Sequence, residues 1–531
     1  MICPQCQKQN REQAHYCKWC GSALSNDNTG PLADLVGMDN VKKQLMTLVA
    51  RYEEHQRRMK TTGVSQPFTA NIIISGEMGT GKTMLVEMIE KLFSQKGMTK
   101  HPATYILNSE EFDAFRNAKD FDANLAKAKG GILCIDAVHK LLPDGQDTNT
   151  TSLDRIFSGV QTWKGDPFVI LCGWSVVLDG YLKNNPNIRD RFDLVINLPG
   201  YTYEELTEIC SRRLLLTHGL GLSEDARKKL LRVVRQAKRD RLTDTNGYYA
   251  KNLADAIAIK HAGKGPQTST IITPDEIDGK EYVELSFDEA IKQMDKYIGV
   301  DKIKDNIRNL TTMMKMQAER EGTEVKCKDH FLFLGNPGTG KTTIARVFAD
   351  VMAAMGVLKV GQLIEVSRKD LVAPYVGQTA PMVEAAVNKA IGGILFIDEA
   401  YTLSQGENDS FGKEAIDTLL KLMEDRRGDF ICIAAGYDQE MNDFLGTNSG
   451  LASRFNETIH FDDYTGEQLY DIFQMMMKGN KLTLNPDDET WTRNYFKKMY
   501  LMRGAKFGNA RDVRNVLDKA KKEQAHRLLE L

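Results

Sequence analysis

The chain reads Gly335-Asn336-Pro337-Gly338-Thr339-Gly340-Lys341-Thr342 in its second half and Gly76-Glu77-Met78-Gly79-Thr80-Gly81-Lys82-Thr83 in its first half. Both stretches fit the phosphate-binding loop pattern. Each follows a short apolar run (331–334 and 72–74), as expected of a strand that leads into a helix. Glycines at these positions let backbone N–H groups surround phosphate oxygens at a helix N-terminus. The sequence therefore predicts two nucleotide sites on an α/β fold.

The two predicted sites differ where a catalytic carboxylate is expected. A second apolar strand reads Ile394-Leu395-Phe396-Ile397-Asp398-Glu399 in the later copy and Ile132-Leu133-Cys134-Ile135-Asp136-Ala137 in the earlier one. Both copies keep an aspartate that can assist Mg²⁺, but only the later copy has a glutamate placed to polarise a water molecule. We therefore expect hydrolysis in the second site.

Each residue of the second site has an expected role. Lys341 neutralises the β- and γ-phosphates of ATP, and Thr342 and Asp398 hold Mg²⁺. The nucleotide contacts are expected to run from Gly335 to Thr343. In the first site, the loop 76–83 and Asp136 are expected to bind ATP with slow or no turnover; the alternative is a dead site that binds nothing.

Composition places the chain among ordinary globular proteins. It has 531 residues, of which 42% are apolar, and its 70 Lys and Arg nearly balance its 72 Asp and Glu. The global charge therefore gives no sign of nucleic-acid binding. No uninterrupted apolar run is long enough for a membrane span, and no signal peptide is recognisable. Four of nine cysteines cluster before residue 21 and the other five are scattered along the chain, so we expect a reducing, cytoplasmic setting without a disulfide framework.

The pattern of apolar runs, turn residues and repeats predicts five segments. They are a zinc ribbon (1–24), a linker (25–31), a first α/β module (32–263), a polar connector (264–284) and a second α/β module (285–531). In each module, strands that alternate with helices predict a parallel sheet with helices on both faces. Each module then ends in a region that reads as helices only, which we expect to form a lid.

The N-terminal segment carries a metal-binding pattern. Cys3-Pro-Gln-Cys6 and Cys17-Lys-Trp-Cys20 form two Cys-x-x-Cys knuckles, which can place four thiolates tetrahedrally around Zn²⁺. So short a segment has almost no apolar core, so metal binding would have to drive its folding. A redox pair or a disulfide is the alternative. A protein partner is favoured over nucleic acid, because the segment has few basic residues.

The second module resembles the CbxX/CfxQ family of AAA+ ATPases, and the first resembles a divergent copy of it. The resemblance covers about residues 285–525 and rests on four motifs: the loop 335–342, Tyr375-Val376-Gly377-Gln378-Thr379-Ala380-Pro381, the stretch from Phe411 to Asp425, and Ala435-Gly436-Tyr437. The implied fold is two tandem P-loop AAA+ modules, each a parallel sheet between helices with a helical lid. The zinc ribbon expected before them is not part of the family's shared module. The implied assembly is a homo-oligomer, most simply a hexamer.

The resemblance also implies roles for single residues. Arg454 matches an arginine finger that reaches the γ-phosphate bound by a neighbouring subunit, and Arg511 matches the sensor-2 arginine of the lid. Tyr375, Val376 and Gly377 match a pore loop that grips a polypeptide. Other positions match the family pattern less closely. Tyr437 stands at the usual sensor-1 asparagine, for which Asn448 is a candidate substitute. In the first module, Arg191 stands at the finger position and Lys251 at the sensor-2 position.

Two other features have ordinary explanations. The stretch Arg227 to Leu242 holds eight basic residues, which read as the solvated face of a lid helix or, less simply, as a patch for an acidic partner. The run Met475-Met476-Met477 is expected to pack inside a helix bundle.

Three functions fit the sequence. The leading hypothesis is a ring-forming ATPase that remodels a protein substrate recruited in part by the zinc ribbon. A nucleotide-gated scaffold and a nucleic-acid loader or helicase-like ATPase are the alternatives. The last would need basic pore loops, but the segment 367–380 holds only Arg368 and Lys369, against Asp370.

Overall fold

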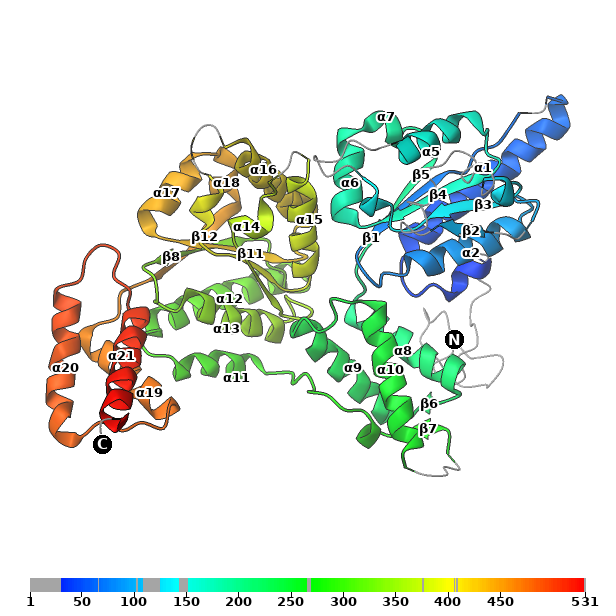
Figure 1. Ribbon diagram of the computed structural model, residues 1–531. Coiled ribbons are helices and arrows are strands. Elements are labelled where there is room, and N and C mark those ends of the chain that lie inside the picture. Colours follow the sequence, from blue (N-terminus) through cyan, green and yellow to red (C-terminus); the bar gives the residue numbers. More distant parts are fainter. Residues whose placement is uncertain are drawn as a thin grey trace. The chain divides into compact units, whose positions relative to one another are not determined.

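The structure is a computed structural model that describes residues 30–64, 66–101, 104–107, 125–142, 151–264, 269–374, 377–404, 406 and 409–529. The cysteine-rich segment and most of the linker lie outside these ranges. The chain divides into two units, Met1–Tyr282 and Val283–Leu531, which are described separately (Figure 1). Among the described residues, no helix is both long and apolar enough to cross a bilayer.

The first unit is built on a five-stranded parallel sheet. Its strands are β1 (Ile72–Gly76), β2 (Thr104–Leu107), β3 (Ile132–Ile135), β4 (Phe168–Gly173) and β5 (Leu194–Leu198), in the spatial order β2-β3-β4-β1-β5. The phosphate-binding loop leaves β1, which lies between β4 and β5. A parallel sheet of this kind needs helical crossovers between its strands.

The second unit repeats the same strand order. Its strands are β8 (His330–Gly335), β9 (Leu363–Val366), β10 (Ile394–Ile397), β11 (Ile431–Gly436) and β12 (Phe455–Phe461), in the order β9-β10-β11-β8-β12. The registers also agree, because Gly76 pairs with Leu198 in the first sheet and Gly335 with Phe461 in the second. The predicted α/β fold with parallel sheets is confirmed, and positions in the two units can be matched strand by strand.

Helices cover both faces of each sheet, because successive strand residues point to opposite faces. In β8, Phe331 and Phe333 pack into one apolar cluster and Leu332 and Leu334 into another. The helices over the second sheet are α11 (Phe287–Lys292), α12 (Asp301–Glu321) and α13 (Lys341–Ala354) on one face, and α14 (Arg368–Leu371), α15 (Thr379–Ala390), α16 (Ser410–Asp425), α17 (Asp438–Gly446) and α18 (Ser449–Arg454) on the other (Figure 1). Those over the first are α1 (Asp39–Thr62) and α2 (Lys82–Gln95), opposite α5 (Thr151–Thr162), α6 (Ser175–Asn184) and α7 (Pro186–Arg189).

Each unit ends in a helical lid with a separate apolar core. The lid of the first unit contains α8 (Tyr203–His218), α9 (Glu224–Arg239) and α10 (Gly247–Ala262); that of the second contains α19 (Gly466–Gly479), α20 (Pro486–Leu501) and α21 (Ala510–Leu529). Capping boxes begin both lids: Thr202 accepts from the N–H of Glu205, and Thr465 from that of Gln468. These caps fix where each lid starts.

The segment expected to be a connector is, in part, a structured piece of the first lid. Residues 269–282 include the short strand β7 (Ile271–Ile272), which pairs with β6 (Gly221–Leu222), and Ile272 and Ile277 are buried in the lid core. The boundary between the units therefore falls after Tyr282, within the predicted 264–284 range.

A buried histidine makes the stability of the second unit dependent on pH. His330 begins β8, and its Nδ1 accepts a hydrogen bond from the N–H of Cys432 at 3.0 Å. Burial lowers the pKa of His330 to about 4. The unfolded chain therefore binds a proton near pH 6.5 that the folded chain binds only near pH 4, so stability falls as the pH falls through this window.

Lowering the pH from 7 to 5 is expected to remove about 2 kcal/mol of stability through His330. His330→Asn keeps an acceptor near the N–H of Cys432 but removes the titrating group. Denaturant unfolding followed at both pH values should therefore show a smaller pH effect in this variant. An equal loss in both proteins would assign the pH effect to other groups.

Candidate nucleotide site

The second phosphate-binding loop connects β8 to α13. Gly338 and Gly340 have φ values of 74° and 94°, and a Cβ on Gly338 would collide with the carbonyl of Gly508. The ammonium of Lys341 donates to the carbonyls of Gly335 at 2.7 Å and Asn336 at 2.9 Å. The loop is therefore closed around the lysine with its N–H groups at the start of a helix.

A pocket of about 390 Å³ opens at this loop. Its phosphate-binding end is lined by Pro337, Gly338, Gly340, Lys341, Thr342 and Thr343. Asp398 and Glu399, which follow β10, line the same pocket. The other predicted loop residues shape the loop: Asn336 donates to Asp463 at 2.9 Å, and the Thr339 hydroxyl donates to the carbonyl of Asn336 at 2.8 Å. The volume is in the range of small-molecule sites.

Burial in this pocket disfavours the charged form of Lys341. Desolvation is the largest influence and lowers the pKa of Lys341, while the carboxylates of Asp398 and Asp438 oppose it. An anionic ligand stabilises the charged form of a buried cation, and backbone N–H groups beside that cation add hydrogen bonds to the ligand. The residues present therefore fit a phosphate group, and the Thr342 hydroxyl and the Asp398 carboxylate supply the oxygen ligands that Mg²⁺ prefers.

Glu399 is held in an uncommon backbone conformation. Its φ is 49°, and its carbonyl accepts hydrogen bonds from both the N–H of Thr402 at 2.8 Å and the Thr402 hydroxyl at 2.7 Å. Non-glycine residues rarely occupy this region. The turn therefore fixes the point from which the carboxylate enters the pocket.

The pocket also has an apolar and aromatic part of its lining. This part consists of Tyr297, Ile298, Val300, Ile472, Met475 and Met476. The expectation that the methionine run only packs inside the bundle is corrected for two of its members, because Met475 and Met476 line the pocket while Met477 is buried in the lid core. Sequence alone could not predict that these two residues of α19 line the pocket, because their position depends on how the lid folds.

The lid contributes cations and a structural anchor. Arg511 and Arg514, one turn apart on α21, line the pocket, and neither forms a salt bridge within the described part of the chain. Asn509 accepts from the N–H of Tyr464 at 2.9 Å, and the Tyr464 hydroxyl donates to the carbonyl of Thr339 at 3.1 Å. The lid is therefore fastened to the phosphate-binding loop beside the pocket.

Comparison with known proteins identifies this arrangement. The family model of the ATPase family associated with various cellular activities (AAA) matches residues 331–463, and an AAA lid domain matches residues 465–531. Stage V sporulation protein K of Bacillus subtilis (strain 168) is 43% identical over 245 residues, which are 45% of this chain and 76% of that protein. The chain belongs to the CbxX/CfxQ family of AAA+ ATPases.

Further matches extend the comparison. The chloroplastic ribulose bisphosphate carboxylase/oxygenase activase of Cyanidioschyzon merolae is 38% identical over 253 residues, covering 47% of this chain and 86% of that protein. A solved chain titled "Closed State CryoEM Reconstruction of Hsp104:ATPyS and FITC casein" aligns over 91% of this chain and 92% of its own at 15% identity and a TM-score of 0.45. Both family-model ranges lie in the second unit. The family match shows that this AAA+ protein is an ATPase, which acts on ATP.

Other predicted site residues of this ATPase lie outside its pocket. Arg454 ends α18 and pairs with Glu424 at 2.9 Å, and its Nε has no hydrogen-bond partner among the described residues. Asn448 caps α18 by accepting from the N–H of Gly450 at 2.8 Å, so the substitute sensor-1 role is not supported. Gly377 has a φ of 83°, whereas Tyr375 and Val376 lie outside the described residues.

The first unit of the ATPase repeats the loop geometry. The ammonium of Lys82 donates to the carbonyls of Gly76 and Glu77, each at 2.8 Å, and the Thr83 hydroxyl lies 3.4 Å from Asp136. Ala137 has a φ of 55°, close to that of Glu399. The first unit therefore keeps the turn that presents the glutamate but lacks the carboxylate.

Hydrogen bonds from each lid to its phosphate-binding loop show which residue of the first lid matches Arg511 of the second. The N–H of Gly247 donates to the carbonyl of Gly79 at 2.9 Å, as that of Ala510 donates to Gly338 at 3.2 Å. Tyr248 therefore occupies the position of Arg511, and the expectation that Lys251 stands there is wrong by three residues. The Ala-Lys and Ala-Arg pairs are similar in sequence, but the lid register is set by the residues bonded to the loop.

Proposed function

We propose that this protein is a ring-forming AAA+ ATPase that remodels a protein substrate, with hydrolysis in the second unit and mainly structural ATP binding in the first. The observation that carries the proposal is the contrast between Glu399 and Ala137, which occupy matched turns after β10 and β3. One site has a carboxylate beside its phosphate-binding loop and the other has a methyl group.

The catalytic residues divide the chemistry of phosphoryl transfer. Lys341 binds the β- and γ-phosphates and spreads their charge. Thr342 and Asp398 would hold Mg²⁺, which neutralises charge that develops on the phosphate oxygens. Glu399 accepts a proton from the attacking water. Arg511 contacts the γ-phosphate from the lid.

Arg454 completes the site from a neighbouring subunit. Its position outside the pocket of its own chain supports a role across an interface. A guanidinium at the γ-phosphate stabilises the transition state. A homo-oligomeric ring, most simply a hexamer, would place Arg454 of one subunit beside the Lys341 of the next.

A protein substrate is favoured over nucleic acid. Of the two basic residues near the predicted pore loop, Arg368 is held by Asp409 at 2.6 and 3.0 Å and is not available to a phosphate backbone. The relative named as an activase of ribulose bisphosphate carboxylase/oxygenase has a protein as its named target. Tyr375, Val376 and Gly377 would grip the polypeptide in the ring.

Tyr375→Ala is expected to abolish substrate-stimulated ATP turnover while basal turnover stays within about twofold, because the pore loop adds contact area without touching the nucleotide. The substrate is first captured with Glu399→Gln protein, and turnover is then measured with and without it. Stimulation that is unchanged in Tyr375→Ala would favour the nucleotide-gated scaffold.

The chain is expected to bind about one Zn²⁺ through Cys3, Cys6, Cys17 and Cys20. These residues lie outside the described ranges, so zinc remains a prediction. Metal analysis of the full-length protein and of a Cys3→Ser/Cys6→Ser variant tests it. No zinc in the full-length protein, or an equal zinc content in the full-length protein and the variant, would contradict the assignment. Loss of zinc should weaken substrate capture and leave basal turnover largely intact.

A further inference from the structure

Asp463 joins the phosphate-binding loop of the second unit to the lid. It stands just before Tyr464, where the chain leaves β12 for the lid. One carboxylate oxygen of Asp463 accepts from the side-chain amide of Asn336 in the loop at 2.9 Å and from that of Asn509 in the lid at 2.8 Å. Its other oxygen lies 3.4 Å from Nε of Arg503, which is also in the lid. A single carboxylate therefore receives donors from both the loop and the lid.

The contacts of Asp463 hold the start of the helix that carries Arg511. Asn509 is fully buried, and α21 begins at the residue that follows it. Arg511, on the first turn of α21, lines the nucleotide pocket, whereas Asp463 is not part of the pocket wall. Because side chains leave a helix in directions set by its backbone, holding the first residues of α21 also holds the direction of Arg511.

The first unit has the same junction without the carboxylate. Asn246 precedes α10 as Asn509 precedes α21; their φ values are 51° and 50°, and each accepts from the N–H of the tyrosine that precedes its lid. The residue before that tyrosine is Gly200 in the first unit, at the position of Asp463. A Cβ on Gly200 would lie 3.1 Å from the amide oxygen of Asn246. The first unit thus keeps the asparagine but has no side chain at the position of the carboxylate.

The second residue of the phosphate-binding loop also differs between the units. It is Asn336 in the second unit, where it binds Asp463, and Glu77 in the first. Glu77 accepts from the hydroxyl of Ser175, at the start of α6, at 3.2 Å. Its side chain is therefore bonded to a helix over the sheet, and the first loop has lost the donor of this contact as well as the acceptor.

The hydrogen bonds of the two lid asparagines differ accordingly. The amide of Asn246 donates to the carbonyl of Met78, in the first loop, at 3.0 Å. The matching distance from Asn509 to the carbonyl of Pro337 is 3.4 Å, and the bond from Asn509 to Asp463 is shorter. In the second unit, Asp463 therefore binds a donor that the loop backbone holds in the first.

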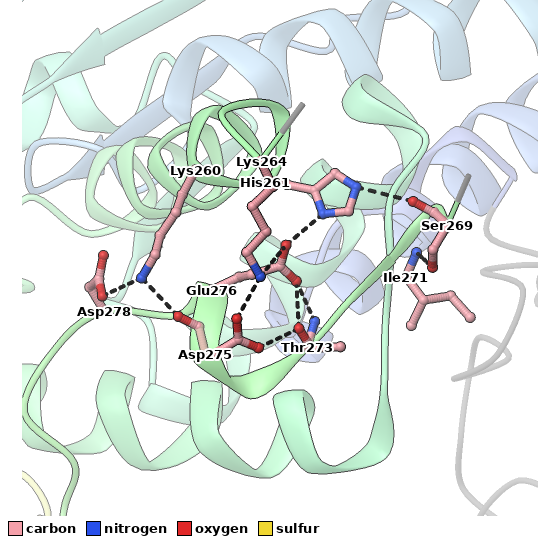
Figure 2. A network of polar contacts seen from close by, with 9 residues as sticks. All are labelled: Lys260, His261, Lys264, Ser269, Ile271, Thr273, Asp275, Glu276 and Asp278. Atoms are coloured by element: carbon pink, nitrogen blue, oxygen red, sulfur yellow. Dashed lines mark hydrogen bonds and ion pairs between the residues drawn. The ribbon is translucent and has the colours of Figure 1, made fainter. Parts of the chain in front are cut away.

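A buried carboxylate of the first lid stabilises a different end of its helix. Glu276 is 2% exposed and lies 2.8 Å from His261, near the C-terminal end of α10 (Figure 2). Burial alone would raise the pKa of Glu276, but hydrogen bonds from the N–H of Thr273 and from His261 lower it to about 2. This network holds residues 269–282 against the lid, whereas the N-terminal end of α10 contacts the loop. A carboxylate therefore braces the first lid internally, and Asp463 ties the second lid to its loop.

We propose that Asp463 is a positioning residue that directs Arg511 towards the γ-phosphate of ATP. By binding amides of the loop and of the lid together, its carboxylate sets the angle at which α21 leaves the loop. The inference rests on the proposed contact between Arg511 and the γ-phosphate. Both residues are replaced in the first unit, by Gly200 and Tyr248, which fits a site that holds ATP without hydrolysing it.

The preference of the second site for ATP over ADP reports on Arg511, because ADP lacks the γ-phosphate. Binding of each nucleotide with Mg²⁺ is measured by equilibrium dialysis in Lys82→Ala/Glu399→Gln protein, so that only the second site binds and ATP persists. Arg511→Ala and Asp463→Ala are each expected to lower the ratio of ATP to ADP affinity about tenfold, as loss of a hydrogen bond to a charged group does. Adding Asp463→Ala to Arg511→Ala should change the ratio less than about twofold, because Asp463 acts through Arg511.

Asp462→Ala is the matched control. Asp462 is the adjacent carboxylate and pairs with Lys302 at 2.8 Å on the surface, so its loss should leave the ratio within about twofold. Asp463→Asn keeps one accepting oxygen for the two amides and should lower the ratio less than Asp463→Ala does. ADP affinity should change little in either Asp463 variant, whereas a general loss of structure would lower the affinities for both nucleotides.

Three results would overturn the positioning role. They are an unchanged ratio in Asp463→Ala, equal losses of ATP and ADP binding in both Asp463 variants, and a full further loss when Asp463→Ala is added to Arg511→Ala. A ratio that is unchanged in Arg511→Ala would contradict the proposed contact of Arg511 itself. A ratio that falls in Arg511→Ala but not in Asp463→Ala contradicts only the role of Asp463.

Discussion

Glu399→Gln is expected to lower ATP turnover by roughly 10²–10⁴-fold, the usual range for a positioned general base. The amide keeps the size of the side chain and its place after β10 but accepts no proton from water. Lys341→Ala should lose most turnover as well, because phosphate binding itself is lost. The assay is steady-state phosphate release at ring-forming protein concentrations.

Lys82→Ala is the control for this prediction. It removes the matched lysine of the first unit and is expected to weaken ring assembly while leaving most turnover per assembled ring. Loss of most turnover in intact Lys82→Ala rings, or Glu399→Gln activity near that of the unmodified protein, would show that the assignment of hydrolysis to the second unit is wrong.

Arg454→Ala is expected to reduce turnover by about 10³–10⁵-fold, as removal of an arginine finger does. Glu424→Gln is its matched variant, because it breaks the ion pair of Arg454 within the chain and leaves the guanidinium in place. If the finger acts across an interface, Glu424→Gln should retain turnover. Turnover per subunit of the unmodified protein should also rise steeply with protein concentration.

Mixing two inactive variants tests whether Arg454 acts within its own chain or across a subunit interface. Arg454→Ala subunits have an intact loop, and Lys341→Ala subunits have an intact finger, so mixed rings contain interfaces that combine both. Recovery of activity supports action across the interface. Mixed rings proven by mass spectrometry but without activity would mean that several adjacent intact sites are needed or that Arg454 serves its own chain. Concentration-independent turnover by a stable monomer would show that Arg454 serves its own chain.

The sequence predicted the sheets and the loops because their signals are local. Apolar runs followed by a glycine-rich loop place a phosphate site between a strand and a helix wherever they occur. The contrast between Glu399 and Ala137 is also visible directly in the amino-acid sequence. The structure adds that both residues share one backbone conformation, so the loss of the carboxylate occurs without loss of the turn.

The lids were less predictable because their residues meet the site through tertiary packing. Lys251 matched Arg511 by its neighbours in sequence, but hydrogen bonds from Asn246 and Gly247 to the first loop place Tyr248 there. Polar residues with Gly265, Pro266 and Pro274 predict a connector over 264–284, but residues 269–282 carry charges that contact the first lid. Those charges are paired with α9 and α10, which no short-range pattern reveals.

We propose that the second unit hydrolyses ATP while the first holds it. The most direct test is the nucleotide content of purified Glu399→Gln protein after incubation with ATP and Mg²⁺, measured by chromatography of the acid-released nucleotides. We expect about two ATP per chain with almost no ADP, since neither site then has a water-activating carboxylate. ADP accumulating to about one per chain in this variant would contradict it, because the first unit would then be hydrolysing ATP without that group.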